Sequence, residues 1–152
     1  MHITIDELTD AITRGASPRA VLQFVAFGGD VNARLADSGL TLLHLAVEYE
    51  HLPMIHALID AGADIEARAA SGWTPLHQAV DFDIDTASQT TGWAAGDFIR
   101  TLTFATTKLL IALGADAEAR CVDGRTPRDM AAAYSEEVAK KYDEAVAHAR
   151  KP

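Results

Sequence analysis

The sequence predicts an all-α fold in which pairs of short helices stack into a solenoid and are joined by hairpin-like loops. One pattern, in which a glycine is followed two residues later by a threonine that can start a helix, occurs at residues 37–46, 70–79 and 122–131. A second pattern, Gly-x-Asp-x-x-Ala-Arg, occurs at residues 28–34, 62–68 and 114–120. Such self-similarity is the signature of stacked repeats.

The spacing of the first pattern predicts about four units and one insertion. Thr41 and Thr74 are 33 residues apart, whereas Thr74 and Thr126 are 52 apart, which is 19 more than one period. We therefore expect a single domain over residues 1–152. Its expected parts are an N-terminal capping repeat at about 1–34, a repeat at 35–68, a repeat at 69–120 with an insertion at about 81–100, and a C-terminal capping repeat with a terminal helix at 121–152.

Local start signals predict the first two helices. Thr4 and Glu7 have the spacing of a capping box, in which each side chain bonds to the backbone N–H of the other residue. Ser17 followed by Pro18 combines a hydroxyl cap with a residue whose fixed dihedral is already helical. Helices are therefore expected at about 5–14 and 18–27.

The later units start in the same way, each with a hydroxyl residue that can cap a helix. Proline follows the threonine in two of them, where its missing N–H costs nothing. Leucine, a good helix former, takes that place in the other. The expected starts are Thr41-Leu42, Thr74-Pro75, Thr126-Pro127 and, for the last helix, Ser135-Glu136.

Three glycines are expected to end helices. Gly28, Gly62 and Gly114 open the second pattern. Glycine adopts the left-handed conformation of a helix end without a clash between a side chain and the backbone. The residues after each glycine should therefore extend into a hairpin.

The segment Thr-Pro-Leu-His-Gln-Ala at residues 74–79, with the Gly-Ala-Asp of the second pattern, resembles the ankyrin repeat. The resemblance covers about residues 17–134. It implies stacked units that bury leucine and alanine between them, and a concave protein-binding face made by hairpin tips and inner helices. It also implies that His44 and His77 are structural, bonding to backbone groups and threonine hydroxyls. The chain departs from the family pattern at Glu50, where the family has glycine, and at Arg128-Asp129, where it has Leu-His.

Carried onto this sequence, the family's binding face comprises the hairpin tips and the ends of the inner helices. Tyr49 and Trp73 are the anchors that we expect, because large rigid rings bury much area at a small entropic cost. Packing of Trp73 against the next hairpin is the alternative. The contact residues expected outside the insertion are Asp37, Ser38, Leu40, Glu48, Tyr49, Ser71, Trp73, Asp123 and Arg125.

The insertion is expected to form a loop that extends this face. It combines carboxylates with Phe82, Trp93 and Phe98, a composition typical of an interface hot spot. The alternative is that the rings hold the loop to its own repeat. The contact residues expected here are Asp81, Phe82, Asp83, Asp85 and Trp93.

The charge distribution favours a basic protein as the partner. The net charge is −9, and the segment 37–97 alone holds ten acidic residues against one base, Arg68. Such a surface repels nucleic acid, whose phosphates need clustered lysine and arginine. It attracts a cationic protein. The alternative is that the acidity only aids solubility.

No residue pattern predicts catalysis, a cofactor or a metal site. Asp81, Asp83 and Asp85 alternate as in a calcium loop, but Thr86 and Gly92 stand where that loop needs glycine and glutamate. His51 and His56 are five residues apart, which does not bring them together on a helix. No phosphate loop, nucleophile elbow or cysteine-containing triad is present in the sequence.

These features predict a protein-binding module that inhibits its partner stoichiometrically, as an immunity protein (antitoxin) masks the basic cleft of a toxin. The alternatives are an adaptor or effector scaffold, and an enzyme or metal protein that uses the acidic insertion. We expect a monomer when free, and a cytoplasmic location without membrane contact. The sequence has no apolar stretch of about 20 residues and no leader, and its single cysteine, Cys121, suits a reducing compartment.

Overall fold

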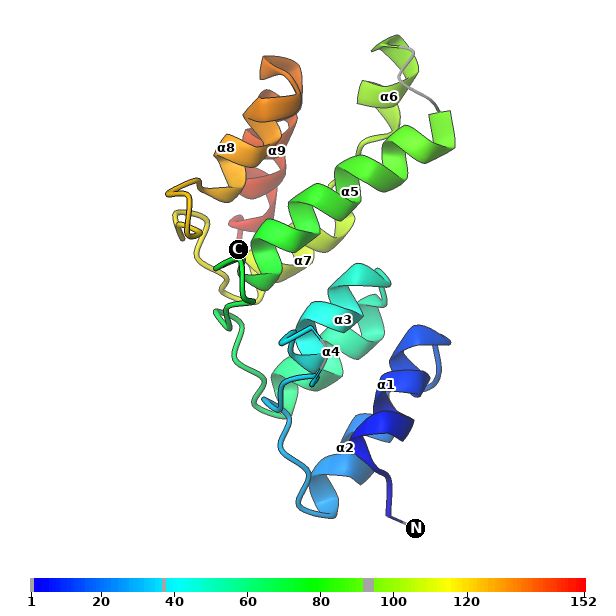
Figure 1. The fold of residues 1–152 in the computed structure, drawn as a ribbon. Helices are drawn as coiled ribbons and strands as arrows, with labels where there is room; N and C mark the ends of the chain where they lie inside the picture. Colours follow the sequence, from blue (N-terminus) through cyan, green and yellow to red (C-terminus); the bar gives the residue numbers. More distant parts are fainter. Residues whose placement is uncertain (1, 37, 92–94) are drawn as a thin grey trace.

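The computed structural model describes residues 2–36, 38–91 and 95–152, and Figure 1 shows them as a row of helix pairs. The helices are α1 (Ile5–Thr13), α2 (Arg19–Ala26), α3 (Leu42–Glu48), α4 (Leu52–Asp60), α5 (Pro75–Thr91), α6 (Ala95–Thr101), α7 (Ala105–Ala112), α8 (Pro127–Tyr134) and α9 (Glu136–Ala149). Within the described residues, no helix has the length and apolar character that crossing a bilayer requires.

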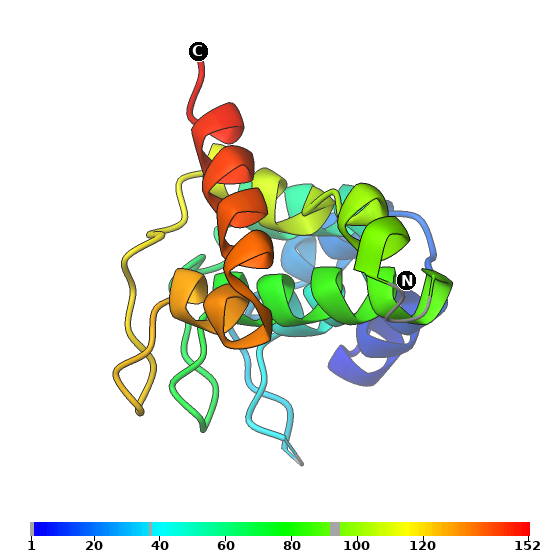
Figure 2. The same cartoon turned by 90° about the horizontal axis from the view of Figure 1, so that it is seen from above.

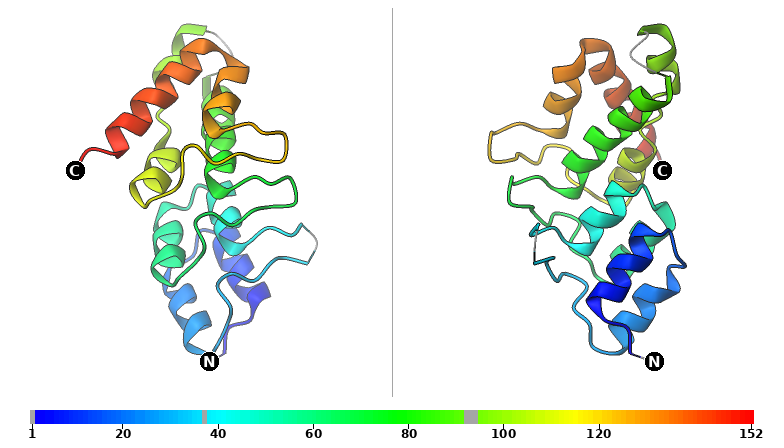
Figure 3. Two further views of the ribbon diagram at one scale, coloured as in Figure 1. Left: turned by 90° about the vertical axis from the view of Figure 1, so that its left-hand side faces the viewer. Right: turned by 45° about the vertical axis from the view of Figure 1, so that its right-hand side comes forward.

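The helices form two layers, and the all-α solenoid predicted from the repeats is confirmed. An inner layer runs through α1, α3, α5 and α8, each in contact with the next. In the outer layer, α2 contacts α4, and α7 contacts α9. Figures 2 and 3 show three hairpin loops that project from one edge of the stack and lie side by side.

Most of the predicted helix starts and ends are confirmed; the exception is α2, which begins at Arg19 with Pro18 as its N-cap residue and without a side-chain cap bond. Thr4 and Glu7 form a capping box, and Thr41 and Thr126 cap α3 and α8 in the same way. The Ser135 hydroxyl accepts a hydrogen bond from the N–H of Val138 at the start of α9. The three helix-ending glycines have positive φ angles, which are 82° at Gly28, 96° at Gly62 and 102° at Gly114.

Glu50 adopts the left-handed backbone conformation at the position where the family has glycine. Its φ is 48°, so a residue with a side chain occupies the left-handed region. The Glu50 carboxylate accepts a hydrogen bond of 3.1 Å from the Thr86 hydroxyl on α5. This contact ties the turn between α3 and α4 to the next repeat.

Arginine side chains hold neighbouring hairpins together. Arg34 donates to the Gly39 carbonyl of its own hairpin at 2.9 Å and to the Arg68 carbonyl of the next hairpin at 2.7 Å. Arg68 repeats this pattern, with bonds to Gly72 in its own hairpin and to Arg120 in the following one. The Ala-Arg that ends the second sequence pattern therefore sets the register between repeats.

His44 and His77 have the structural role that the resemblance implies. Both are fully buried. The Nδ1 of His44 lies 2.9 Å from the Thr41 hydroxyl, and its Nε2 lies 3.1 Å from the Trp73 carbonyl. His77 makes the equivalent contacts with the Thr74 hydroxyl and the Arg125 carbonyl. A neutral ring with its proton on Nε2 satisfies all of these groups.

We expect the protein to lose stability on mild acidification because of these two histidines. Burial lowers the pKa of both His44 and His77 below the usual value of 6.5. The unfolded chain therefore takes up protons first, so stability is present above pH 6.5 and is lost as the pH falls through the folded-state pKa values. Urea titrations between pH 7.5 and pH 5.5 should show a decrease on the order of 1 kcal/mol for each histidine.

A paired variant tests the assignment. His44→Gln should flatten the pH dependence, whereas His56→Gln should not, because His56 is exposed on α4. An unchanged slope in His44→Gln would contradict the assignment to the buried rings.

The insertion is helical, which corrects the expectation of a loop at residues 81–100. α5 runs without interruption from Pro75 to Thr91, and α6 begins at Ala95. Figure 1 shows α5 extending beyond α3, with α6 beside its far end. Val80, Ile84 and Ala87 are buried at helical spacing, which is the sequence signal for this extension. Phe98 on α6 is 5% exposed, so its ring packs in the core.

Candidate functional site

A cleft of about 250 Å³ lies where the second and third hairpins meet α5 and α8. Trp73 and Arg125 reach it from the hairpins, and Asp81 reaches it from α5. The remaining lining residues come from α8 and are Met130, Ala133 and Tyr134. The structure thus brings together three residues that the sequence predicted for the binding face.

A carboxylate and a phenol meet in this cleft. The Tyr134 hydroxyl donates a hydrogen bond of 2.9 Å to the Oδ1 of Asp81. Burial, this hydrogen bond and the charges of Asp81 and Asp85 raise the pKa of Tyr134 to about 12. Asp81 is half-buried, and Asp85 is exposed one helical turn further along α5. The cleft therefore presents negative charge next to aromatic surface.

Trp73 contributes both to the core and to the cleft. Its half-buried ring packs against the hydrophobic core and also lines the cleft. Its carbonyl accepts the hydrogen bond from His44. Arg125 is exposed and donates to the carboxylate of Asp123 at 3.3 Å.

The inner helices carry a row of aromatic residues at one repeat position. Tyr49, Phe82 and Tyr134 each stand eight residues after the capping threonine of their unit. Tyr49 is 49% exposed, Tyr134 is 42% exposed and Phe82 is half-buried. Tyr49 directly follows α3, Phe82 lies on α5 and Tyr134 ends α8, and these three helices are successive neighbours in the inner layer. We call these three residues the aromatic row.

Tyr134 belongs to this row but was not predicted from the sequence. Alignment of the three units was the signal that could have found it, since Tyr49 and Phe82 were both expected contacts at the same position. Met130 likewise lacked a signal, because its part in the cleft depends on how α8 sits against α5.

The hairpin residues shape the loops as well as exposing side chains. The hydroxyls of Ser38 and Ser71 accept hydrogen bonds from the N–H groups of Leu40 and Trp73, at 3.4 Å in each hairpin. Both serines are exposed, and Leu40 is half-buried. Asp37 and Trp93 lie outside the described residues, so their expected contacts stay predictions.

Asp83 is buried, which corrects its expected place on the binding face. It is 7% exposed and accepts hydrogen bonds from the backbone N–H of Thr106 at 3.3 Å and of Thr107 at 2.9 Å. The Thr107 hydroxyl donates to it at 2.7 Å. Asp83 therefore caps α7, whose own N-cap residue makes no side-chain bond. Burial raises the pKa of the Asp83 carboxyl, and the bonds from Thr107 and Thr106 oppose this effect.

The acidic residues of the central segment divide between the cleft and other surfaces. Glu48, Asp81 and Asp85 lie at or near the aromatic row on α3 and α5. Among the others that the structure describes, Glu50 bonds to Thr86 and Asp83 caps α7. Asp60 ends α4, Asp64 and Glu66 lie in the following loop, and Asp97 pairs with Arg100 on α6. Only part of the charge that the sequence shows is therefore available to a partner in the cleft.

The acidic residues do not gather into a cation site in the described parts of the chain. No group of three or more His, Cys, Asp or Glu side chains there is arranged to hold a metal ion. Of the three alternating aspartates, Asp83 points into the core, whereas Asp81 lines the cleft and Asp85 is exposed. Helical geometry separates the side chains that a loop could have brought together.

Comparison with known proteins places the chain among repeat proteins. A family model described as ankyrin repeats, in three copies, matches residues 8–89. The chain is 48% identical over 54 residues to the nuclear factor NF-kappa-B p105 subunit of Gallus gallus, covering 35% of this chain and 6% of that protein. It is 35% identical over 68 residues to the neurogenic locus Notch protein of Drosophila melanogaster, covering 45% of this chain and 2% of that protein.

A smaller relative matches over a longer stretch. Protein phosphatase 1 regulatory subunit 27 of Homo sapiens is 37% identical over 98 residues, which is 64% of this chain. The match covers 51% of that protein, so the chain spans about half of its length. The matches to the two larger relatives cover only small parts of them.

Proposed function

Because the chain belongs to the ankyrin-repeat family, we propose that it is a protein-binding module whose cleft and aromatic row hold a basic segment of another protein. One observation carries the proposal. Asp81 lies in the cleft with Trp73 and with Tyr134, which also belongs to the aromatic row. An arginine from a partner can pair with this carboxylate while its guanidinium plane stacks on a ring.

The proposed complex explains the mixture of side chains in the cleft. Buried aromatic residues contribute most of the affinity in protein interfaces, and a charged pair adds orientation and speed of association. Asp85 extends the negative surface by one turn, so a partner segment with two basic residues could engage both carboxylates. Arg125 at the cleft rim is already near Asp123, so it does not cancel the charge of Asp81.

We further propose that binding inhibits the partner stoichiometrically, by masking a basic functional surface. A cationic cleft that acts on nucleic acid would be occluded by a segment-binding module of complementary charge. The human relative's name, a regulatory subunit of a phosphatase, is in keeping with a regulator that acts by binding. An adaptor would use the same cleft but would leave the partner active in the complex.

A selected peptide tests the cleft. Random twelve-residue peptides displayed on phage and selected on the immobilised protein should be enriched in arginine and lysine. For the tightest peptide, Asp81→Asn should raise the Kd about tenfold, because the substitution keeps the shape but removes the charge. Asp60→Asn is the matched control, since it removes one exposed carboxylate at the end of α4. Isothermal titration gives both values.

Salt supplies a second measurement on the same peptide. Its association rate should fall when sodium chloride is raised from 50 mM to 500 mM, because exposed charges are screened over a shorter distance.

Selected peptides without basic residues, or an equal loss of affinity in Asp60→Asn, would refute the proposed cleft. A partner identified through such a peptide should lose its activity at one equivalent of the chain; full activity in the complex would indicate the adaptor instead.

A further inference from the structure

A second cavity, of about 340 Å³, lies on the opposite layer of the fold, and three of its nine lining residues are lysine or arginine. It is bounded by the end of α6, the segment that leads into α7, and α9. Its charged or titratable residues are Arg100, Lys108, Lys141, Glu144 and His148. It shares no lining residue with the cleft that contains Asp81.

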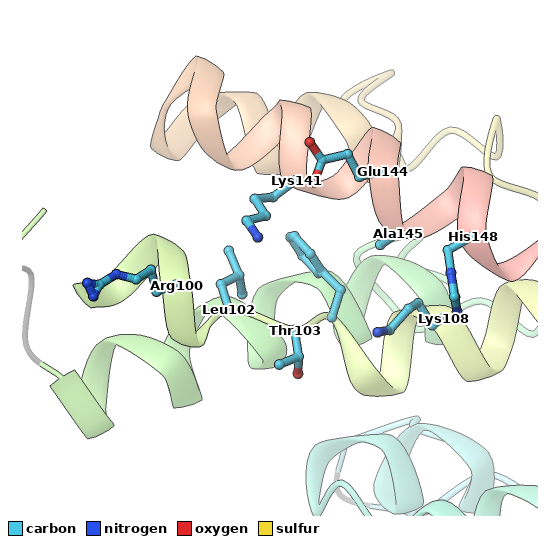
Figure 4. A pocket seen from close by; sticks show the side chains of 9 residues that line it. Arg100, Leu102, Thr103, Lys108, Lys141, Glu144, Ala145 and His148 are labelled. Carbon is cyan, nitrogen blue, oxygen red and sulfur yellow. The ribbon is translucent and has the colours of Figure 1, made fainter. Parts of the chain in front are cut away.

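Two lysines from different helices converge on this cavity. Figure 4 shows Lys141 reaching from α9 into the space between the helices and Lys108 lying along α7 beside His148, and both line the cavity. Both lysines are half-buried. Within the described parts of the chain, neither makes an ion pair. An anion bound between two ammonium groups that make no ion pair is attracted by both of them.

The charge of the cavity suits a dianion. Its three permanent cations and one carboxylate leave two positive charges when His148 is neutral. Arg100 has a surface carboxylate, Asp97, only at 4.0 Å, and both side chains are more than 70% exposed. A phosphate monoester carries a charge of about −1.5 to −2 at pH 7. Lysine binds phosphate as a point charge, which fits two ammonium groups on opposite walls.

Part of the cavity lining is apolar and buried. Leu102 and Phe104 belong to it and are 3% and 1% exposed. The cavity volume is near the lower end of the range for small-ligand sites, which is about 300 to 1,000 Å³. It therefore has room for a phosphate and a small group attached to it, and not for a folded element of a partner.

We propose that this cavity binds a phosphate monoester, held between Lys108 and Lys141. A free phosphorylated small molecule and a phosphoserine side chain of a partner both present this group. The site is a consequence of the insertion, because Arg100 and the residues that follow it come from α6 and its exit, and they face α9 of the last unit. It goes beyond the proposed protein binding at the cleft and does not depend on it.

Titrations monitored by the backbone amide resonances test the site. The probes are phenyl phosphate, a ten-residue peptide with one phosphoserine, and the same peptide without the phosphate. Phenyl phosphate should bind saturably with a Kd of about 1 mM or tighter, and should shift resonances in α7 and α9. Lys108→Gln and Lys141→Gln should each raise the Kd about tenfold.

Two variants give matched controls with opposite expectations. Lys140→Gln removes a neighbouring exposed lysine that does not line the cavity, and it should leave the Kd within about twofold. Glu144→Gln removes the carboxylate of the cavity, and it should tighten binding. Asp81→Asn should leave the Kd for phenyl phosphate unchanged, so the experiment tests the cavity independently of the proposed protein-binding cleft.

The outcomes discriminate between sources of the phosphate. Equal affinities for phenyl phosphate and the phosphopeptide would assign the site to a free phosphorylated small molecule. Tenfold tighter binding of the phosphopeptide, with no binding of the unmodified peptide, would assign it to a phosphorylated partner. The absence of saturable shifts with both phosphorylated probes, or an equal loss in Lys140→Gln, would overturn the proposal.

Discussion

Phe104→Ala is expected to lower the free energy of unfolding by about 4 kcal/mol, the largest effect that we expect from any single substitution. Phe104 is 1% exposed and directly precedes α7, and its ring meets Tyr142 of α9 edge to face with centroids 5.9 Å apart. Truncation would leave a cavity where the insertion, α7 and α9 come together. Urea unfolding of both proteins at one pH gives the difference.

The backbone conformation at Phe104 allows a second substitution to be predicted at the same position. Its φ is 51°, so the chain turns into α7 through a left-handed residue. Glycine tolerates this conformation better than alanine, so Phe104→Gly should recover on the order of 1 kcal/mol relative to Phe104→Ala. Phe27→Ala is the control on a ring that is 50% exposed, and it should cost less than about 1 kcal/mol. A loss in Phe104→Ala no greater than in Phe27→Ala would contradict the packing described.

Asp83→Ala is expected to lower the free energy of unfolding by about 3 kcal/mol. The same substitution at an exposed aspartate on α5 would lower it only slightly. Asp83→Ala leaves two backbone N–H groups and one hydroxyl at the start of α7 without an acceptor in the core. Each buried polar group without a partner costs about 1 to 3 kcal/mol, and the removed desolvation of the carboxylate offsets part of the sum. Thermal or urea unfolding measures the loss.

Two companion variants separate the cap from general effects of charge. Asp83→Asn keeps one acceptor oxygen and should cost about 1 to 2 kcal/mol. Asp85→Ala removes an exposed carboxylate two residues along the same helix, with a surface hydrogen bond to Gln89, and should change stability by less than about 0.5 kcal/mol. Equal losses of unfolding free energy in Asp83→Ala and Asp85→Ala would contradict a stabilising role for the buried cap.

The candidate cleft was only partly predictable. Trp73 and Arg125 were expected contacts because the repeat alignment puts them in hairpins, and Asp81 was expected because it begins the insertion. Tyr134 was not predicted, although it stands at the same repeat position as Tyr49 and Phe82. The basic cavity had no sequence signal at all, since Lys108 and Lys141 are 33 positions apart and belong to different units.

The segment 81–91 shows how residue type can mislead. A long insertion between the helices of a repeat favoured a loop, whereas the buried Val80, Ile84 and Ala87 follow the helical period. The alternating pattern also did not indicate that Asp81 lines the cleft, Asp83 is buried and Asp85 is exposed. Successive helical residues turn by about 100°, so residues two apart point in different directions.

The sequence by itself determined the repeat architecture, the helix starts and the helix ends. Thr41, Thr126 and Gly62 act through bonds and dihedral preferences that span only a few residues, so their effect can be predicted wherever they occur. Tertiary structure alone decided that Asp83 caps a helix 23 residues away and that two lysines share one cavity. Burial and long-range hydrogen bonding assign these roles, and both depend on which surfaces meet when the units stack.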